Sequence, residues 1–450
     1  MSKGLQHIES KQINRLAIPA ILGGIAEPVI SLVDTAFVGR IGTVELAAVG
    51  IATSFYLMTV WILAQTLTAI AAIVSRYYGS GSIEEIKSLI PQALISNILL
   101  GLAFYALTNY FAADIFRFYN ADGEVLEACV AYFNIRSIGF PFTLATLLLF
   151  GIFRGLQNTS WAMGIALTGA AVNIILDYVL IFGWPHVLQP MGIEGAAYAS
   201  LSAQVLMFCV ALFVLIRKTP FNLKIKTKVN REFKWLMQMS ADLFLRTILL
   251  NLTFYLATRF ATGYGNAVIA AHTIALNIWL FSSFFIDGYA HAGNAIAGRL
   301  SGLKNSAALH YLGKKIGKIS LYIGGSLMIV YFILYPFMAE FFTKDARVVE
   351  IFNGIFWLVV ITQPINALAF AFDGIYKGLG HTKYLRNLLV GATLLAFTPI
   401  VLAFHYISPS LMGIWIGFLA WMAVRAFWLL RDFNLRYPGP SVQSGNLPIK

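Results

Sequence analysis

Gly151-Ile-Phe-Arg-Gly-Leu-Gln-Asn-Thr159 returns 223 residues later as Gly374-Ile-Tyr-Lys-Gly-Leu-Gly-His-Thr382. The same spacing aligns Glu45-Leu-Ala-Ala-Val-Gly-Ile-Ala52 with Val268-Ile-Ala-Ala-His-Thr-Ile-Ala275. A third match at this spacing pairs Arg76 and Gly79 with Arg299 and Gly302. Three separated matches at one spacing are not expected by chance, so the sequence predicts two repeated halves.

Apolar runs long enough to cross a bilayer surround these matches. The 450-residue chain is 59% hydrophobic and only 12% charged, and a soluble protein carries about twice that share of charge. We predict an all-α polytopic membrane protein with twelve spans, six in each half. The predicted spans are 14–38, 52–75, 89–111, 128–150, 161–183, 195–216, 235–261, 268–297, 314–339, 350–375, 384–406 and 411–430.

The basic residues are distributed unevenly between the two sides of these spans. Of 32 Lys and Arg residues, 25 fall on the side of the termini and six on the other, and Arg246 lies within a span. Arg425 is counted on the side of the termini, and Arg136 is assigned to an external loop. By the positive-inside rule both termini are predicted to be cytoplasmic. The net charge of +12 therefore indicates topology, and no nucleic-acid partner is expected.

These spans define the predicted domains. We expect an N-terminal six-helix bundle over 1–216 and a basic cytoplasmic linker over 217–234. A C-terminal six-helix bundle over 235–432 and a disordered cytoplasmic tail over 433–450 follow. Because six is even, both halves enter the membrane from the same face, and the cleft between such halves is the usual place for a substrate.

Asp34 lies in the first span, where a carboxylate near mid-bilayer costs about 2.5–3.5 kcal/mol. Three further polar residues of the first half, Glu27, Asn173 and Asp177, also lie in spans. The repeat aligns Glu27, Asp34, Asn173 and Asp177 with Leu250, Ala257, Ala396 and Ile400. Groups needed only for the shared fold would recur in both halves, so a role specific to the first half is favoured.

The spacing of these groups suggests a proton or cation site. Glu27 and Asp34 are seven residues apart and share a helix face, as do Asn173 and Asp177, four residues apart. Pro19 and Pro28 remove backbone donors and can bend the same helix. The alternative interpretation is a polar cluster that only holds helices together.

The second half has a polar set of its own, Asp242, Arg246 and Asp287. Asp242 and Arg246 are four residues apart and are expected to neutralise each other. Asp287 either joins them or faces the cleft, and Asp373 is expected to be structural. As candidates for an apolar substrate cavity we select Tyr255, Trp279, Phe284 and Met58.

Motifs for enzymatic chemistry are not found in the sequence. No His, Cys and carboxylate cluster has the spacing of a structural metal site, and there is no Walker A motif or nucleophile elbow. We therefore predict neither an enzyme nor a cofactor. A membrane-embedded transferase would need a catalytic loop cluster, and the acidic loop around 111–127 has no recognisable pattern.

The residues then resemble a known family. Pro19 and Val33-Asp34-Thr-Ala-Phe-Val-Gly39, followed by Glu45-Leu-Ala-Ala-Val-Gly50, are similar to the multidrug and toxic compound extrusion (MATE) family. The repeated glycine motif and Asn173 with Asp177 also resemble it. Asp242-Leu-Phe-Leu-Arg246-Thr and Asp287-Gly-Tyr-Ala look like its DinF-like branch. The resemblance covers about residues 14–430.

The resemblance implies a V-shaped pair of six-helix bundles and an antiporter that exports organic cations or amphipathic compounds. It implies that Asp34 carries the coupling ion, that Asn173 and Asp177 join it, and that protonation bends the first helix near Pro19. The sodium-coupled branch has acidic residues where this chain has Leu250-Asn251 and Gln363-Pro-Ile-Asn366. That departure favours protons.

We therefore predict a proton-coupled multidrug antiporter in the bacterial inner membrane. Its expected partners are a drug-like or amphipathic small molecule, protons and the lipid bilayer, and we expect a monomer. Two alternatives remain open. One is a flippase or exporter of lipid-linked or other amphipathic metabolites, and the other is sodium-coupled antiport through the first-half carboxylates.

Overall fold

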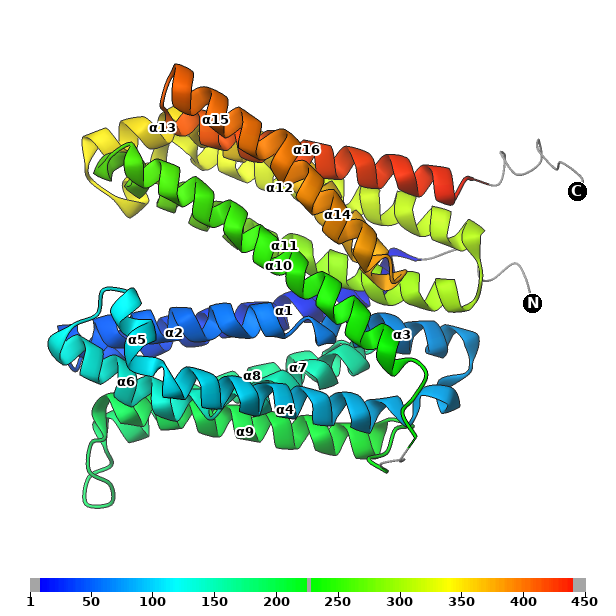
Figure 1. The fold of residues 1–450 in the computed structure, drawn as a ribbon, viewed down its shortest axis with the longest axis horizontal. Helices are drawn as coiled ribbons and strands as arrows, with labels where there is room; N and C mark the ends of the chain where they lie inside the picture. Colours follow the sequence, from blue (N-terminus) through cyan, green and yellow to red (C-terminus); the bar gives the residue numbers. More distant parts are fainter. Residues whose placement is uncertain (1–8, 225–227, 440–450) are drawn as a thin grey trace, which may run out of the picture. The chain divides into compact units, whose positions relative to one another are not determined.

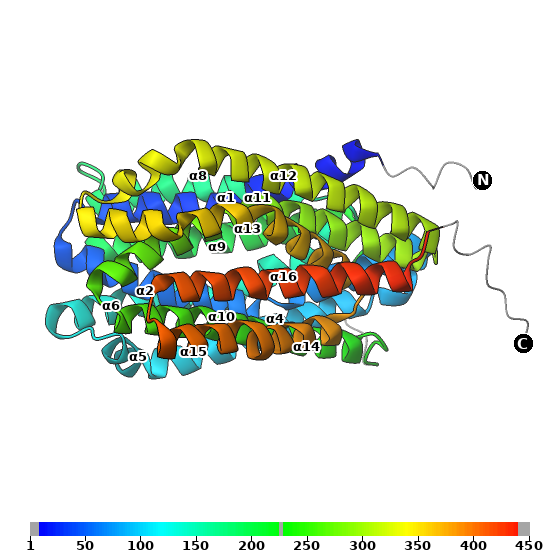
Figure 2. The same cartoon turned by 90° about the horizontal axis from the view of Figure 1, so that it is seen from above.

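The computed structural model describes residues 9–224 and 228–439, with the backbone alone for residues 26–28. This described part is helical, and its single β pairing is a bridge between Trp184 and Leu188. The first half contains α1 (Ser10–Val38), α2 (Thr43–Leu63), α3 (Thr66–Ser80), η1 (Ile83–Ile86), α4 (Leu89–Tyr110), α5 (Ala112–Phe118), α6 (Gly123–Ser137), α7 (Phe140–Gly155), α8 (Ser160–Phe182) and α9 (Gly192–Lys218) (Figure 1). The second half contains α10 (Phe233–Gly263), α11 (Asn266–Gly302), α12 (Ser306–Phe342), α13 (Ala346–Gly378), α14 (Thr382–Ala392), the π-helical η2 (Thr393–Phe397), α15 (Thr398–Ile407) and α16 (Leu411–Arg436) (Figure 2).

The described helices account for the predicted spans. Eleven are long and apolar enough to cross a membrane, and the bent pair α6–α7 gives a twelfth. The all-α architecture with twelve spans is confirmed. Two spans differ from the prediction because they are interrupted. Predicted span 52–75 crosses the break between α2 and α3, and predicted span 128–150 crosses a 48° bend between α6 and α7. Pro141 follows this bend and lacks a backbone donor.

Contacts between residues divide the chain into two compact units. The first unit comprises Leu22–Ser240, and the second comprises Met1–Ile21 together with Ala241–Lys450. Both boundaries fall inside helices, α1 and α10, so each of these helices contributes to both units. The predicted halves share most of these residues but assign each of the two helices to one half. Asp34 therefore lies on a helix whose beginning belongs to the other unit.

The repeated glycine motif brings helices into close contact in both units. A Cβ atom added to Gly374 on α13 would lie 2.1 Å from the backbone oxygen of Ala290 on α11. At the equivalent Gly151 on α7 it would lie 2.3 Å from the backbone oxygen of Leu67 on α3. Because these neighbours are backbone atoms, a larger residue cannot be accommodated by a side-chain rotation. The motif therefore recurs because the same helix contact recurs.

The buried cores explain which helices each unit holds together. In the second unit, Ile13 and Leu16 from the start of α1 pack in one cluster with Ile296 and Leu312. A second cluster there is rich in aromatic rings and includes Trp279, Phe418 and Trp421, among other residues of α11, α13 and α16. The start of α1 is therefore part of the second unit's core.

The ends of the predicted domains are partly different from the prediction. α16 continues to Arg436, so the prediction that the disordered tail begins at residue 433 is wrong for its first four residues. Residues 440–450 of that tail lie outside the described part. α9 ends at Lys218, and residues 225–227 of the predicted linker also lie outside it.

Candidate coupling site

Asp34 is buried toward the end of α1. Its exposed fraction is 4%, and the helix ends at Val38. The carboxyl group therefore lies in the last turns of the span. The residues on either side of Asp34 carry no charge, so its carboxyl group has no charged partner next to it in the sequence. Its partners come from α6, α8 and α9.

Asp177 and Asn173 lie one turn apart on α8 and are buried, with exposed fractions of 0% and 1%. The Asp177 carboxyl and the Ser200 hydroxyl on α9 both lie near enough to the Asp34 carboxyl to act on it electrostatically. Asn173 Nδ2 lies 3.5 Å from Ser200 Oγ. The structure thus brings Asp34, Asn173 and Asp177 together, and it adds Ser200, which was not predicted as a site residue.

Arg136 on α6 supplies the positive charge beside this pair. Its exposed fraction is 7%, and its charge acts on both Asp34 and Asp177. Its guanidinium carbon lies 4.4 Å from the ring centroid of Tyr56 on α2. The prediction that Arg136 lies in an external loop is wrong, because α6 extends to Ser137. The apolar residues on both sides of Arg136 were the available signal.

Several oxygens of this cluster lack a hydrogen-bond partner among the described residues. They are Oδ1 of Asp34, both side-chain oxygens of Asp177 and Oδ1 of Asn173. An ionised carboxylate accepts hydrogen bonds but donates none, so two of them in contact repel and cannot satisfy each other. A proton or a bound cation at this place would remove both problems.

The predicted bending residues all lie on α1. Pro19 is partly buried, and the boundary between the two units falls two residues after it, between Ile21 and Leu22. Glu27 and Pro28 lie farther along the same helix, but their side chains are outside the described residues. A titrating role for Glu27 and a bend at either proline stay predictions.

The predicted ion pair between Asp242 and Arg246 is wrong. Asp242 accepts hydrogen bonds from Arg386 Nη1 at 2.6 Å and from the Thr382 hydroxyl at 3.1 Å, both on α14. Arg246 donates instead to Asp373 Oδ1 on α13, at 2.7 Å. The four-residue spacing shows only that two side chains share a helix face. Each of them finds its partner on another helix.

Asp287, the third member of the predicted polar set, is half-buried on α11. Its charge acts on Lys377 and on Arg425. Arg425 lies inside α16 with an exposed fraction of 3%, so counting it among the residues outside the membrane was wrong. Asp287 and Arg246 therefore belong to one charged cluster, around Asp373, and Asp242 belongs to another.

The four predicted cavity residues have different surroundings. Trp279 is buried in an aromatic cluster, with its ring centroid 5.7 Å from that of Phe254. Tyr255 is 59% exposed and Met58 is 38% exposed, and Phe284 is partly buried. Only Trp279 thus has the enclosed aromatic environment that the prediction requires of a cavity residue.

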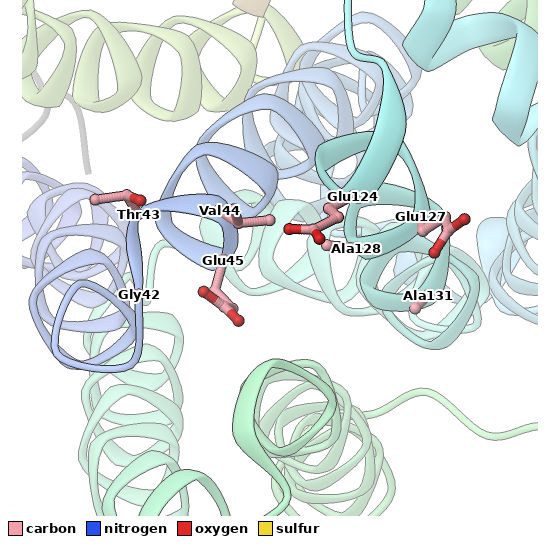
Figure 3. Close-up of a pocket in the computed structure, with 8 residues that line it drawn as sticks. All are labelled: Gly42, Thr43, Val44, Glu45, Glu124, Glu127, Ala128 and Ala131. Atoms are coloured by element: carbon pink, nitrogen blue, oxygen red, sulfur yellow. The ribbon is translucent and has the colours of Figure 1, made fainter.

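An open pocket of about 500 Å³ lies between the start of α2 and α6 (Figure 3). The carboxylates of Glu45, Glu124 and Glu127 line it. A pocket of about 550 Å³ in the second unit contains Gly265 and Arg347, which the 223-residue repeat aligns with Gly42 and Glu124. The internal repeat is therefore visible in the structure, although the charge of the two pockets differs. No predicted site residue lines either pocket.

A protein-family model described as MatE matches residues 19–179 and 243–406. The two matched segments together span more than half of the chain and correspond to its two repeats. This chain belongs to the MATE family. It is therefore a multidrug efflux transporter of that family, not an enzyme.

Similar proteins agree with this assignment to the MATE family. The chain is 29% identical to Protein DETOXIFICATION 42 of Arabidopsis thaliana, over 93% of this chain and 91% of the relative. It is 25% identical to DNA damage-inducible protein F of Escherichia coli (strain K12), over 94% of this chain and 91% of the relative. This similarity bears out the resemblance to the DinF-like branch. A crystal structure of MATE in the bent conformation has a TM-score of 0.89 and 22% identity, covers 98% of both chains and shows the same fold.

Proposed function

We propose that this MATE transporter is a proton-coupled antiporter that exports small amphipathic compounds, organic cations among them. The observation that carries the proposal is the buried pair of Asp34 and Asp177 beside Arg136. When ionised, the pair has two negative charges against the single positive charge of Arg136. One proton neutralises the remaining negative charge, and the electrostatic free energy gained is large because the groups are shielded from water.

α1 transmits the effect of the proton. Asp34 lies in the part of α1 that belongs to the first unit, and the residues before Leu22 belong to the second unit. Two charged carboxylates repel each other, and a proton between them allows Asp34 to approach Asp177. The end of α1 therefore shifts with protonation. Pro19 removes one backbone hydrogen bond of this helix and makes bending there less costly.

Exchange follows if the two protonation states differ in their affinity for the substrate. A proton that enters from outside favours the state that releases the substrate, and its loss to the cytoplasm restores the state that binds. We propose that both termini are cytoplasmic, because 24 of 32 basic residues fall on that side once Arg425 is left out of the 25. We also propose the inner membrane of a bacterium, because a relative from Escherichia coli matches over 94% of this chain.

A sodium ion is the second candidate for the coupling ion. The oxygens of Asp34, Asn173 and Asp177 that lack hydrogen-bond partners are the kind of ligand that hard cations take. The proton is favoured because it needs no coordination shell, whereas a sodium ion would have to gather several oxygen ligands beside the guanidinium of Arg136. We therefore rank the proton first.

The test is export of ethidium from proteoliposomes under separately imposed proton and sodium gradients. We expect the proton gradient alone to drive export by the wild type. Asp34→Asn and Asp177→Asn are expected to reduce export to the rate of protein-free liposomes. Asp242→Asn is the control, because Asp242 is paired with Arg386 and lies outside the carboxylate cluster. Export by Asp34→Asn at the wild-type rate contradicts proton coupling, and export driven only by sodium selects the second candidate.

A further inference from the structure

Three positively charged side chains from three helices converge on one buried carboxylate of the second unit. Arg246 Nη2 on α10 lies 2.7 Å from Oδ1 of Asp373, and Lys377 Nζ on α13 lies 2.7 Å from Oδ2. Arg425 Nη2 on α16 lies 4.0 Å from Oδ1. The exposed fraction of Asp373 is 3%. Both of its oxygens are thus bound at short distance by cations other than Arg425.

Arg425 differs from the other two cations because it makes no short hydrogen bond to Asp373. Its Nη2 has no hydrogen-bond partner among the described residues, and its Nη1 donates to the sulfur of Met422 at 3.1 Å. A thioether sulfur is a weak acceptor. With only 3% of the residue exposed, the guanidinium is shielded from the surroundings of the protein. A buried donor without an acceptor is costly and calls for a reason beyond packing.

The net positive charge of the cluster also favours the binding of an anion. Among the described residues its cations are Arg246, Lys377 and Arg425, and its carboxylates are Asp373 and Asp287. Three positive and two negative charges give one net positive charge. In a region of low dielectric constant, one monovalent anion would neutralise it with a large gain.

Aromatic rings flank the Arg425 guanidinium. Its carbon lies 4.8 Å from the ring centroid of Trp421 and 5.9 Å from that of Phe370. Phe370 is 6.2 Å from Trp279, and Trp421 is 6.2 Å from Phe254, measured between ring centroids. The charged group therefore lies beside a buried cluster of aromatic rings. If the helices part, such rings suit the apolar part of a molecule whose charged end binds the guanidinium.

We propose that Arg425 binds the carboxylate of an anionic substrate, an aromatic or otherwise amphipathic organic acid whose apolar part lies against Trp421 and Phe370. The guanidinium fork matches a carboxylate through two parallel hydrogen bonds. This inference rests on the proposed transport function, because groups buried so deeply become accessible only when the helices of a transporter part during its cycle. The substrates then include anionic and zwitterionic amphiphiles as well as organic cations.

The phosphate of an anionic lipid has similar hydrogen-bonding chemistry, so the source of the anion must be distinguished. A substrate is the better fit, because the cluster is enclosed by α10, α11, α13 and α16 and adjoins buried rings. A lipid headgroup would be expected at basic side chains exposed at the membrane surface. Retention of a lipid is nevertheless one outcome of the experiment.

The experiment measures equilibrium binding of naphthoate to the purified full-length protein in detergent, by isothermal titration calorimetry. Naphthylmethylammonium, with the same ring and the opposite charge, is titrated in parallel. We expect Arg425→Gln to weaken naphthoate binding about tenfold or more, and to leave binding of the cation unchanged. Arg386→Gln is the matched control, since it removes another guanidinium of the second unit, one that binds Asp242, and should leave naphthoate affinity unchanged.

Folding of the variants does not limit this test. Arg425→Gln leaves two positive and two negative charges in the cluster, so we expect it to fold. Arg425→Lys keeps the charge but loses the fork, and is expected to bind naphthoate with an affinity between those of the wild type and Arg425→Gln. If Arg425→Gln aggregates, Arg425→Lys alone is compared with the wild type.

Three results would overturn the proposal. The first is failure of naphthoate to bind the wild type, and the second is equal naphthoate affinity in the wild type and the Arg425 variants. The third is an anionic phospholipid that copurifies with the wild type, is lost from Arg425→Gln and is not displaced by naphthoate. Because no gradient is imposed, these results are independent of whether Asp34 carries the coupling proton.

Discussion

The two units each bury a charged cluster, and the clusters have opposite sign. In the first unit, Asp34 and Asp177 share the single guanidinium of Arg136. In the second, three cations surround Asp373, and Arg425 lies farthest from its carboxylate oxygens. Among the described residues, oxygens of Asp34, Asn173 and Asp177 lack donors in the first cluster, and Nη2 of Arg425 lacks a hydrogen-bond acceptor in the second. One cluster is therefore suited to a proton or cation and the other to an anion.

The repeat separates what the two units share from what they do not. Close helix contacts recur at Gly151 and Gly374. The carboxylates of the first cluster do not recur, since the repeat aligns Asp34 with Ala257, which is fully buried in an apolar core. In the second cluster the repeat aligns Lys377 with Arg154, but it aligns Asp373 with Phe150. A duplicated fold thus keeps its packing while its buried carboxylates diverge. The predictions that follow test whether the Asp34 carboxylate serves function in the first unit and whether the Asp373 carboxylate serves stability in the second.

The largest effect on stability is expected for Asp373→Asn. This change leaves Arg246 and Lys377 buried without their carboxylate, and breaking a buried ion pair in this way costs about 3–5 kcal/mol. Thermal unfolding in detergent, followed by tryptophan fluorescence, measures it. Asp114→Asn is the control, because the Asp114–Arg117 pair is exposed and such pairs contribute about 0–1 kcal/mol. Equal stability of the two variants would show that the second cluster is not held together by Asp373.

A smaller effect, similar in both units, is expected when the shared packing is changed. Gly374→Ala and Gly151→Ala each place a methyl group against a backbone oxygen of the neighbouring helix. Overpacking of this kind costs about 1–3 kcal/mol. The same unfolding assay checks both variants, with Gly391→Ala as control because a Cβ at Gly391 meets no atom within 4 Å. A loss in one unit only would mean that the repeated motif packs in just one of them.

Arg136→Gln tests the charge balance of the first cluster. Without the guanidinium, the ionised carboxylate pair is less stable, so the pair gives up its proton only at higher pH. The pH profile of proton-driven ethidium export should therefore move toward higher pH by about one unit, equivalent to about 1.4 kcal/mol. Arg117→Gln, at an exposed ion pair of the same unit, should leave the profile in place. If the pH profile of export by Arg136→Gln were the same as that of the wild type, Arg136 would not be part of the coupling site.

The sequence predicted the architecture well because twelve apolar runs and a repeat at one spacing are properties of the chain itself. It also selected Asp34, Asn173 and Asp177, because polar groups inside apolar runs are conspicuous. It missed Arg136 and Arg425, because both were counted with the residues outside the spans, where arginine is ordinary. Burial depends on how neighbouring helices pack, and no periodicity within one helix reveals that.

The incorrect Asp242–Arg246 pair has a related cause. A four-residue spacing on one helix is visible in the sequence, but the partners Arg386 and Asp373 come from positions more than a hundred residues away. Competition between near and distant partners is decided by tertiary packing. The interruptions between α2 and α3 and between α6 and α7 were missed because apolar composition alone carries no signal for a break.

The smallest effect on stability is expected for Asp34→Asn, and it gives the sharpest form of the comparison. The amide can donate a hydrogen bond to an oxygen of Asp177 that lacks a donor, and the repulsion between two carboxylates disappears. Stability in the unfolding assay should therefore be unchanged, or higher by up to about 1 kcal/mol, while proton-driven export is lost. Sites that serve function are commonly stabilised by the substitutions that inactivate them. If Asp34→Asn were as destabilised as Asp373→Asn, Asp34 would be structural like Asp373, and the contrast between the two carboxylates would fail.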